Sequence, residues 1–185
     1  MRKVTSVCVK ECCHCCSQIP LIHDAEYEII RDYVKSDMPP KDFATVKNNL
    51  DRWTGYFCAN TSFNISRHDL IYLEKLTTKN KIFCPFLVNS LCAIYPVRPI
   101  TCRTFTVNHD PDLCRQTPTR TCSLESALLR KELCQELSKQ TKDKRSWPLA
   151  YRMAGCFDVI VPKKLIFSAV KASFATEVLR MLYPR

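Results

Sequence analysis

The feature that most constrains this chain is a dense group of cysteines near its start. Cys8, Cys12, Cys15 and Cys16 stand within nine residues. The pair Cys12-x-x-Cys15 has the spacing that lets two thiolates turn back onto one metal ion. Cys15 and Cys16 are adjacent, so their side chains diverge in most backbone conformations, and we expect them to serve different metal positions. The pattern predicts a fold built around metal ligands.

A second group of cysteines lies in the stretch CPFLVNSLCAIYPVRPITCRTF, which holds Cys84, Cys92 and Cys102. Prolines stiffen the turns between these residues and lower the entropy lost when the loop closes around a metal. Arg98 and Arg103 stand close to two of the thiols. They could offset the net negative charge of four thiolates around zinc or an iron–sulfur cluster. They could equally bind backbone carbonyls or carboxylates.

The cysteines are expected to be reduced, because the start of the chain lacks the apolar core and small-residue cleavage site of a secretory signal. No run approaches the roughly 18 to 20 apolar residues of a membrane span. We therefore expect a cytoplasmic protein that does not enter a membrane. In that compartment cysteine patterns indicate metal binding or catalysis rather than disulfides. The odd total of 13 cysteines also fits poorly with a fully paired disulfide framework.

Composition removes two classes of protein. Only two glycines occur, Gly55 and Gly155, whereas dinucleotide-binding and phosphate-binding loops need several. A formal net charge of +10 would suit an acidic partner, but no basic stripe is interleaved with aromatic residues as in single-strand binders. Nucleic acid is therefore an unfavoured partner. The sequence also shows no carboxylate pair or nucleophile–base pair, so catalytic residues stay unassigned.

Amphipathic helices are predicted to alternate with cysteine-rich loops. Apolar residues recur at helical spacing over residues 24–34, 40–53, 66–76 and 123–137, with Asp24, Ser66 and Ser123 as expected caps. Residues 55–65 are predicted to be extended, residues 81–121 to be loop and residues 157–161 to be a short strand. A last helix is expected from Pro162 to about residue 183.

The fold class predicted from these elements is mainly α with a few short strands. We expect a small, metal-organised single domain with long cysteine-rich loops, since a loop as long as 81–121 needs something to organise it. Residues 1–138 are assigned to the metal-binding domain and residues 139–148 to a polar hinge. Residues 149–185 are expected to form a C-terminal strand and a docked amphipathic helix.

The cysteine spacing also carries a family resemblance. Cys8-x3-Cys12-x2-Cys15-Cys16, Cys84-Pro85-Phe86-Leu87, Cys92-x-Ile94-Tyr95 and Arg98-Pro99-x2-Cys102-Arg103 together resemble the YkgJ-type cysteine-cluster family. That family is described as zinc- or iron-chelating and includes the flagellin lysine N-methylases. The segments CCSQIPLIHDAEYEII (15–30) and TRTCSLESALLRKEL (119–133) are similar to parts of those methylases, and the second adds Cys122 to the implied ligands.

The resemblance implies a bound metal or iron–sulfur centre, and further implies protein lysine methylation with S-adenosylmethionine. The predicted ligand set is Cys8, Cys12, Cys15, Cys16, Cys84, Cys92, Cys102 and Cys122, with Cys114, Cys13 or His14 as possible substitutes. Zinc and a [4Fe–4S] cluster both accept four thiolates, so spacing does not choose between them. Three hypotheses remain: a metalloprotein with a protein partner or substrate, an iron–sulfur-dependent lysine N-methyltransferase, and a zinc-stabilised nucleic-acid-binding module.

Overall fold

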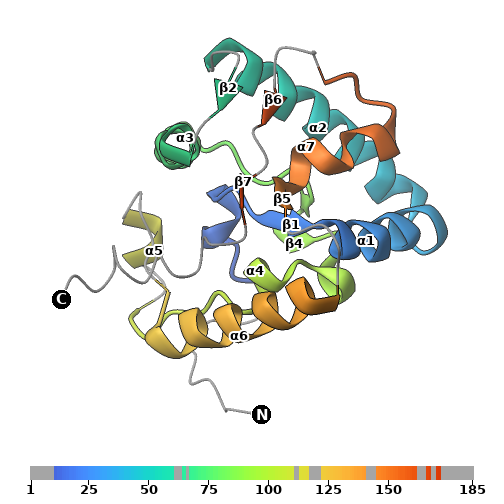
Figure 1. Cartoon of the computed structure of the whole chain (residues 1–185). Coiled ribbons are helices and arrows are strands. Elements are labelled where there is room, and N and C mark those ends of the chain that lie inside the picture. The colour runs from blue at the N-terminus through green and yellow to red at the C-terminus, as the bar shows by residue number, and fades with distance from the viewer. Residues whose placement is uncertain are drawn as a thin grey trace.

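Helices make up most of the fold, and the predicted mainly α class with a few short strands is confirmed (Figure 1). The computed structural model describes residues 11–60, 64–65, 67–110, 113–116, 122–140, 145–161, 166–167 and 170–171. The α-helices are α1 (Asp24–Ser36), α2 (Pro40–Asn60), α3 (Arg67–Lys79), α4 (Ile100–Arg103), α5 (Leu113–Gln116), α6 (Leu124–Gln140) and α7 (Leu149–Met153). The 3-10 helices are η1 (His14–Ser17), η2 (Tyr95–Val97) and η3 (Ala154–Phe157). Within those ranges, no helix is both long enough and apolar enough to cross a membrane.

Short strands join segments that lie far apart in the sequence. The largest sheet has the order β1 (Leu21–His23), β5 (Arg145–Pro148) and β7 (Val170–Lys171), with both pairs antiparallel. A parallel pair joins β2 (Asn64–Ile65) to β6 (Ile166–Phe167), and β3 (Leu87–Val88) forms a hairpin with β4 (Leu91–Cys92). In Figure 1, β1 and β5 lie between α6 at one end and α2 with α7 at the other.

The first two long helices follow their apolar stripes. In α1, Ile30 and Val34 are buried one turn apart, as an amphipathic helix requires. The residue at its N-cap is His23 rather than the expected Asp24. Helix α2 continues to Asn60, so the predicted extended stretch is wrong for residues 55–60. The reason is that Phe57 prolongs the buried helical stripe of α2 into the core.

Aromatic side chains connect the cysteine-rich loop to this core. Phe157 is fully buried, stacks on Phe43 with ring centroids 4.5 Å apart and meets the ring of Phe86 edge-on at 6.0 Å. Such aromatic pairs stabilise a core beyond the area they bury. Phe86 belongs to the loop between Cys84 and Cys92, and it is fully buried as well. The second cysteine segment is therefore anchored in the main core.

The C-terminal part of the chain differs from the prediction. Helix α6 extends to Gln140, and residues 145–148 form strand β5 rather than a hinge. Residues 157–161 are not a strand, because Phe157 ends η3 and the chain turns at Asp158 with a φ of 53°. Within the helix expected after Pro162, the described residues are strands β6 and β7, and the rest lies outside the described residues. Pairing with distant strands overrides the local helical spacing.

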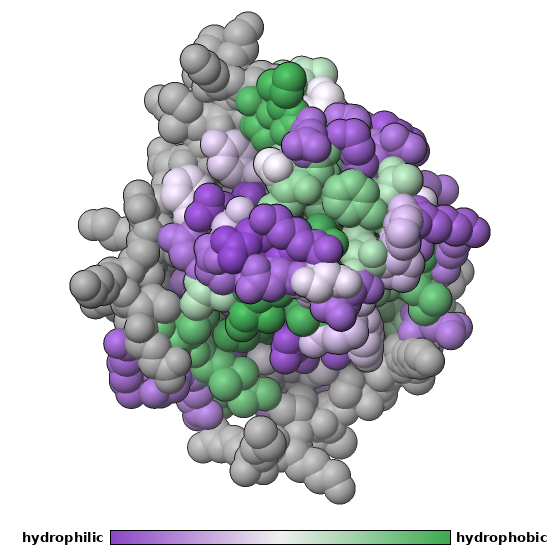
Figure 2. All heavy atoms as spheres, turned by 90° about the vertical axis from the view of Figure 1, so that its right-hand side faces the viewer, coloured by the Kyte–Doolittle hydropathy of each residue, from purple (hydrophilic) through white to green (hydrophobic). Residues whose placement is uncertain are grey.

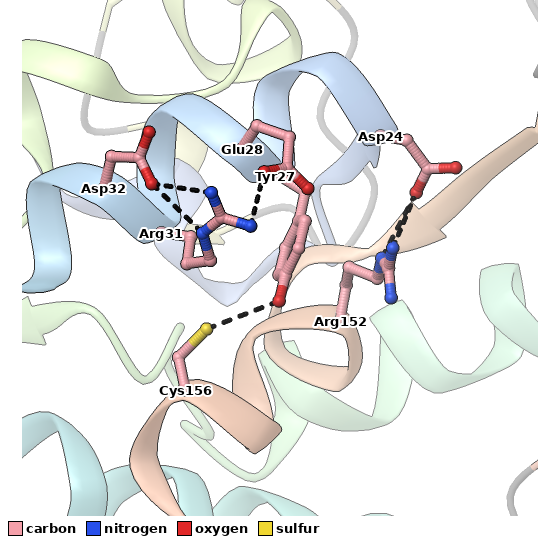
Figure 3. Close-up of polar contacts among 7 residues, drawn as sticks. All are labelled: Asp24, Tyr27, Glu28, Arg31, Asp32, Arg152 and Cys156. Carbon is pink, nitrogen blue, oxygen red and sulfur yellow. Dashed lines mark hydrogen bonds and ion pairs between the residues drawn. The ribbon is translucent and has the colours of Figure 1, made fainter.

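Polar contacts tie α1 to α7 and η3 (Figure 3). The carboxylate of Asp24 forms an ion pair with Arg152 at 3.0 Å, and the guanidinium of Arg152 lies 4.2 Å from the ring centroid of Tyr27. The hydroxyl of Tyr27 is hydrogen-bonded to the Cys156 sulfur at 3.6 Å, which raises the pKa of Tyr27. Cys156 therefore has a structural role. Figure 2 shows the side of the molecule on which α1 lies. Hydrophilic residues cross the middle of this face, and hydrophobic patches lie above and below them.

The tight turn of the β3–β4 hairpin carries strain that a substitution can test. Asn89 and Ser90 have φ values of 49° and 64°, the left-handed pair that two-residue hairpin turns require and that Asn-Gly satisfies best. We expect Ser90→Gly to raise the free energy of unfolding by about 0.5–1 kcal/mol, because glycine adopts this conformation without steric cost. Urea denaturation measures the change. Ser90→Ala keeps a Cβ atom and serves as the control; equal stabilisation by alanine would contradict the explanation.

Candidate metal centre

The first cysteine segment is held in a tight turn against α3. Cys15 and Cys16 lie within η1, and the same turn ends at Ser17. The hydroxyl of Thr77 donates a hydrogen bond to the Ser17 carbonyl at 2.7 Å, and the Ser17 hydroxyl contacts the Thr78 hydroxyl at 3.1 Å. Thr77 is buried, so its bond to Ser17 is shielded from water. Protein contacts therefore fix the position of this turn.

The second cysteine segment is joined directly to the first. The backbone amide of Cys84 donates a hydrogen bond to the carbonyl of Cys16 at 2.5 Å, so the two segments contact each other at these cysteines. A turn follows, closed by a hydrogen bond from the Leu87 amide to the Cys84 carbonyl at 3.0 Å. The β3–β4 hairpin then returns the chain and places Cys92 beside the same turn. The burial of Phe86 anchors the whole segment.

The third cysteine segment is held by a buried carboxylate. Glu26 on α1 is 8% exposed, and its Oε1 accepts the Ile100 amide at 2.7 Å while its Oε2 accepts the His23 amide at 2.9 Å. A second bond runs from the Thr101 hydroxyl to the Leu21 carbonyl at 3.1 Å. The bonds made by Ile100 and Thr101 fix the start of α4, which carries Cys102.

The three segments meet around one cavity of about 590 Å³. Nine cysteines line it: Cys12, Cys13, Cys15, Cys16, Cys84, Cys92, Cys102, Cys122 and Cys134. Seven of the eight predicted ligands are in this set, and the eighth, Cys8, lies outside the described residues. Among the suggested substitutes Cys13 lines the cavity, whereas His14 and Cys114 are not among its lining residues. Within the described ranges, no three Cys, His, Asp or Glu side chains already form a group that could hold an ion.

The thiols around this cavity perturb one another. Burial raises the pKa of Cys84 to about 12, and the charges of Cys92 and Cys15 add to the effect. The pKa of Cys102 lies well above its usual value because of burial and of the charges of Cys84, Cys15 and Cys92. A hydrogen bond with Cys15, together with burial, raises the pKa of Cys16. Thiolates this close repel one another without a cation, and a bound metal ion would relieve that repulsion.

The two predicted arginines have different surroundings. Arg98 lines the cavity with its guanidinium 4.1 Å from the Tyr95 ring centroid. Burial raises the pKa of Cys92, and the positive charge of Arg98 partly offsets the rise. Arg103 donates to two backbone carbonyls, those of Arg98 at 2.6 Å and Pro96 at 3.2 Å. Arg98 thus acts on the thiols through its charge, while Arg103 binds backbone carbonyls.

Sequence reasoning missed several residues at this site. Glu26 was assigned no role, although it fixes α4, and Arg130 and Cys134 also line the cavity. A signal existed in α6, where Ser126, Arg130 and Cys134 recur every four residues and so share one face of the helix. That stripe is polar, although it faces inward, with Ser126 fully buried.

Comparison with known proteins found no matching family model, no similar curated protein and no similar solved structure. The chemistry of the site therefore follows from its donor atoms. All cysteines of the described residues are reduced, and soft thiolates favour zinc and iron–sulfur clusters over magnesium or calcium. The residues present fit such a group in number and in kind.

Proposed function

We propose that this chain is a cysteine-cluster metalloprotein that binds zinc or an iron–sulfur or iron centre. The observation that carries the proposal is the convergence of Cys15, Cys16, Cys84, Cys92 and Cys102, from three separate segments, on one cavity. Buried cysteines that meet by chance behave as small apolar residues. Here these cysteines instead line one cavity together with other polar groups and two arginines, Arg98 and Arg130.

Cysteines on three segments supply enough donors for a centre of four thiolates. Cys16 and Cys84 are joined through their backbones, so thiols from the first two segments would bind together, and Cys102 would complete the set from α4. Cys12 and Cys122 line the same cavity and offer donors for a second position. A closed zinc site would stabilise the fold, whereas an iron–sulfur cluster would add one-electron chemistry. The resemblance to the YkgJ-type family supports the same proposal.

Anaerobic purification followed by elemental analysis and visible spectroscopy tests this proposal. We expect at least one equivalent of zinc or iron per chain, with broad visible absorption in the iron–sulfur case. The double variant Cys84→Ser/Cys102→Ser is expected to lose most of the metal, because each substitution removes a thiolate donor. Cys58→Ser is the matched control, since Cys58 packs against the core on α2. A wild-type protein without stoichiometric metal, or equal metal in both variants, would rule the proposal out.

A further inference from the structure

The cavity lining includes polar groups that the proposed metal centre does not use. Helix α4 contacts both β1 and α6, so His23 at the end of β1 and Arg130 on α6 flank the same short helix. Both residues line the cavity. The thiol of Cys134 lies within electrostatic range of Arg130 and of Glu26, and Glu26 accepts the His23 amide. His23 and Arg130 therefore both lie beside α4, and both belong to the lining of the same cavity.

The guanidinium of Arg130 is held in place but only partly satisfied. Its Nε donates to the hydroxyl of Thr104 at 3.1 Å, and its central carbon lies 5.7 Å from the ring centroid of Phe105. Its Nη2 atom is buried and has no hydrogen-bond partner among the described residues. A buried charged donor without an acceptor is unfavourable, so an acceptor in the cavity would bind there with a gain in free energy.

His23 presents a second such atom. The residue is only 6% exposed, and its side chain faces the Glu26 amide as the N-cap of α1, but its buried Nδ1 has no hydrogen-bond partner among the same residues. Its backbone amide is already committed to Glu26 at 2.9 Å. An imidazole nitrogen can donate or accept, so it can bind either oxygen of a carboxylic group. Two buried polar atoms without a hydrogen-bond partner among the described residues, Arg130 Nη2 and His23 Nδ1, thus belong to residues that line one cavity.

Much of the remaining cavity lining is apolar, so it favours a molecule whose larger part is apolar. Leu70, Ile71, Phe86, Leu91 and Leu149 all contribute to the wall. A cavity of about 590 Å³ with apolar walls and a few fixed polar groups is typical of small-molecule sites.

The acidic side chains near the cavity leave Arg130 available. Glu11 and Glu74 also line the cavity, and Glu74 accepts the Ile19 amide at 3.1 Å. Both oxygens of Glu26 accept backbone amides. None of the ion pairs found among the described residues joins these carboxylates to Arg130.

We propose that this cavity binds a small amphipathic carboxylate, with its carboxylate on Arg130 and His23 and its apolar body against α3 and the cysteine loop. A guanidinium matches the planar carboxylate and can bind it through two parallel hydrogen bonds. An apolar chain or ring would replace water along the walls formed by Ile71 and Phe86. The inference does not depend on a metal, because neither His23 nor Arg130 is a proposed ligand.

Isothermal titration calorimetry of the protein as purified, with decanoate as the probe, tests this inference. We expect one saturable site per chain, and binding of decylamine at least about tenfold weaker, because it places a positive charge beside Arg130. Arg130→Met is expected to weaken decanoate binding about tenfold or more while leaving the metal content unchanged. The control Arg52→Met removes an exposed arginine of α2 that does not line the cavity, so decanoate affinity should be unchanged.

The outcomes separate the two proposals. No saturable decanoate binding, equal binding of decylamine, or full affinity in Arg130→Met would overturn this inference. If Arg130→Met does not fold, the comparison of decanoate with decylamine still decides, together with Ile71→Trp, which fills the apolar wall and should weaken decanoate binding. A metal-free protein that binds decanoate would remove the proposed metal centre and keep the carboxylate site.

Discussion

Removing the proposed metal from the purified protein is expected to lower its melting temperature by about 10–20 °C, corresponding to about 5 kcal/mol. The loss is smaller than the roughly 10–16 kcal/mol measured for zinc-finger peptides, which are unfolded without metal. Here the three segments are already held by protein contacts. Examples are the hydrogen bond from the Cys84 amide to the Cys16 carbonyl and the bond from the Ile100 amide to the Glu26 carboxylate. Metal would add to that framework by removing the repulsion among buried thiols.

The same experiment locates the effect. Hydrogen exchange should show lost protection in residues 84–92 and 100–104 when a chelator strips the metal, because these segments carry the proposed ligands. Amides around Val46 and Leu50 of α2 should stay protected, since those residues are fully buried in the apolar core. Cys15→Ser should start with the lower melting temperature and should not respond to the chelator. Cys58→Ser should respond like the wild type, and a wild-type protein that loses metal without any change in melting temperature would contradict the explanation.

Local patterns predicted the parts of the fold that local physics determines. The buried stripe of α2 from Val46 to Trp53 follows helical spacing in the sequence, and so does α1. The cap of α6 is also as predicted, because the Ser126 amide donates to the Ser123 hydroxyl at 3.2 Å. Each of these features depends on residues within a few positions of one another.

Features that depend on distant pairing were not predictable in this way. Strand β5 forms because residues 145–148 pair with residues 21–23. No local pattern in the stretch KQTKDKRSWP predicts this pairing. Residues 166–171 have apolar positions at helical spacing, yet β6 and β7 pair with β2 and β5. In both cases a non-local hydrogen-bond ladder decides the local conformation.

The candidate site shows the same division. Cysteine spacing and the family resemblance together predicted seven of the cysteines that line the cavity, and ligand spacing is a local property of a loop. It did not show that Cys84 would lie against Cys16, or that Arg130 would face the same cavity from α6. The role of Glu26 was not predictable for a further reason. The sequence does not distinguish a glutamate that accepts buried amides from an exposed glutamate on the same helix.

Glu26→Ala is expected to lower the free energy of unfolding by about 3 kcal/mol, because it leaves one buried and one partly buried amide donor without an acceptor. These donors are the amides of His23 and Ile100, which lie in β1 and at the start of α4. Glu26→Gln should cost less, since one amide oxygen can still accept one of the two bonds. Chemical denaturation measures the loss of stability.

Glu28→Ala is the matched control, because Glu28 lies on the same helix but is exposed and forms an ion pair with the partly exposed Arg31. An exposed ion pair of this kind contributes about 1 kcal/mol or less, so the two alanine variants should differ clearly. Hydrogen exchange gives a second readout that a general loss of stability would not mimic. In Glu26→Ala the Ile100 amide should exchange faster than amides of α2, since its acceptor is gone. If Glu26→Ala and Glu28→Ala proved equally stable, Glu26 would not be the group that holds α4, and with it Cys102, at the cavity.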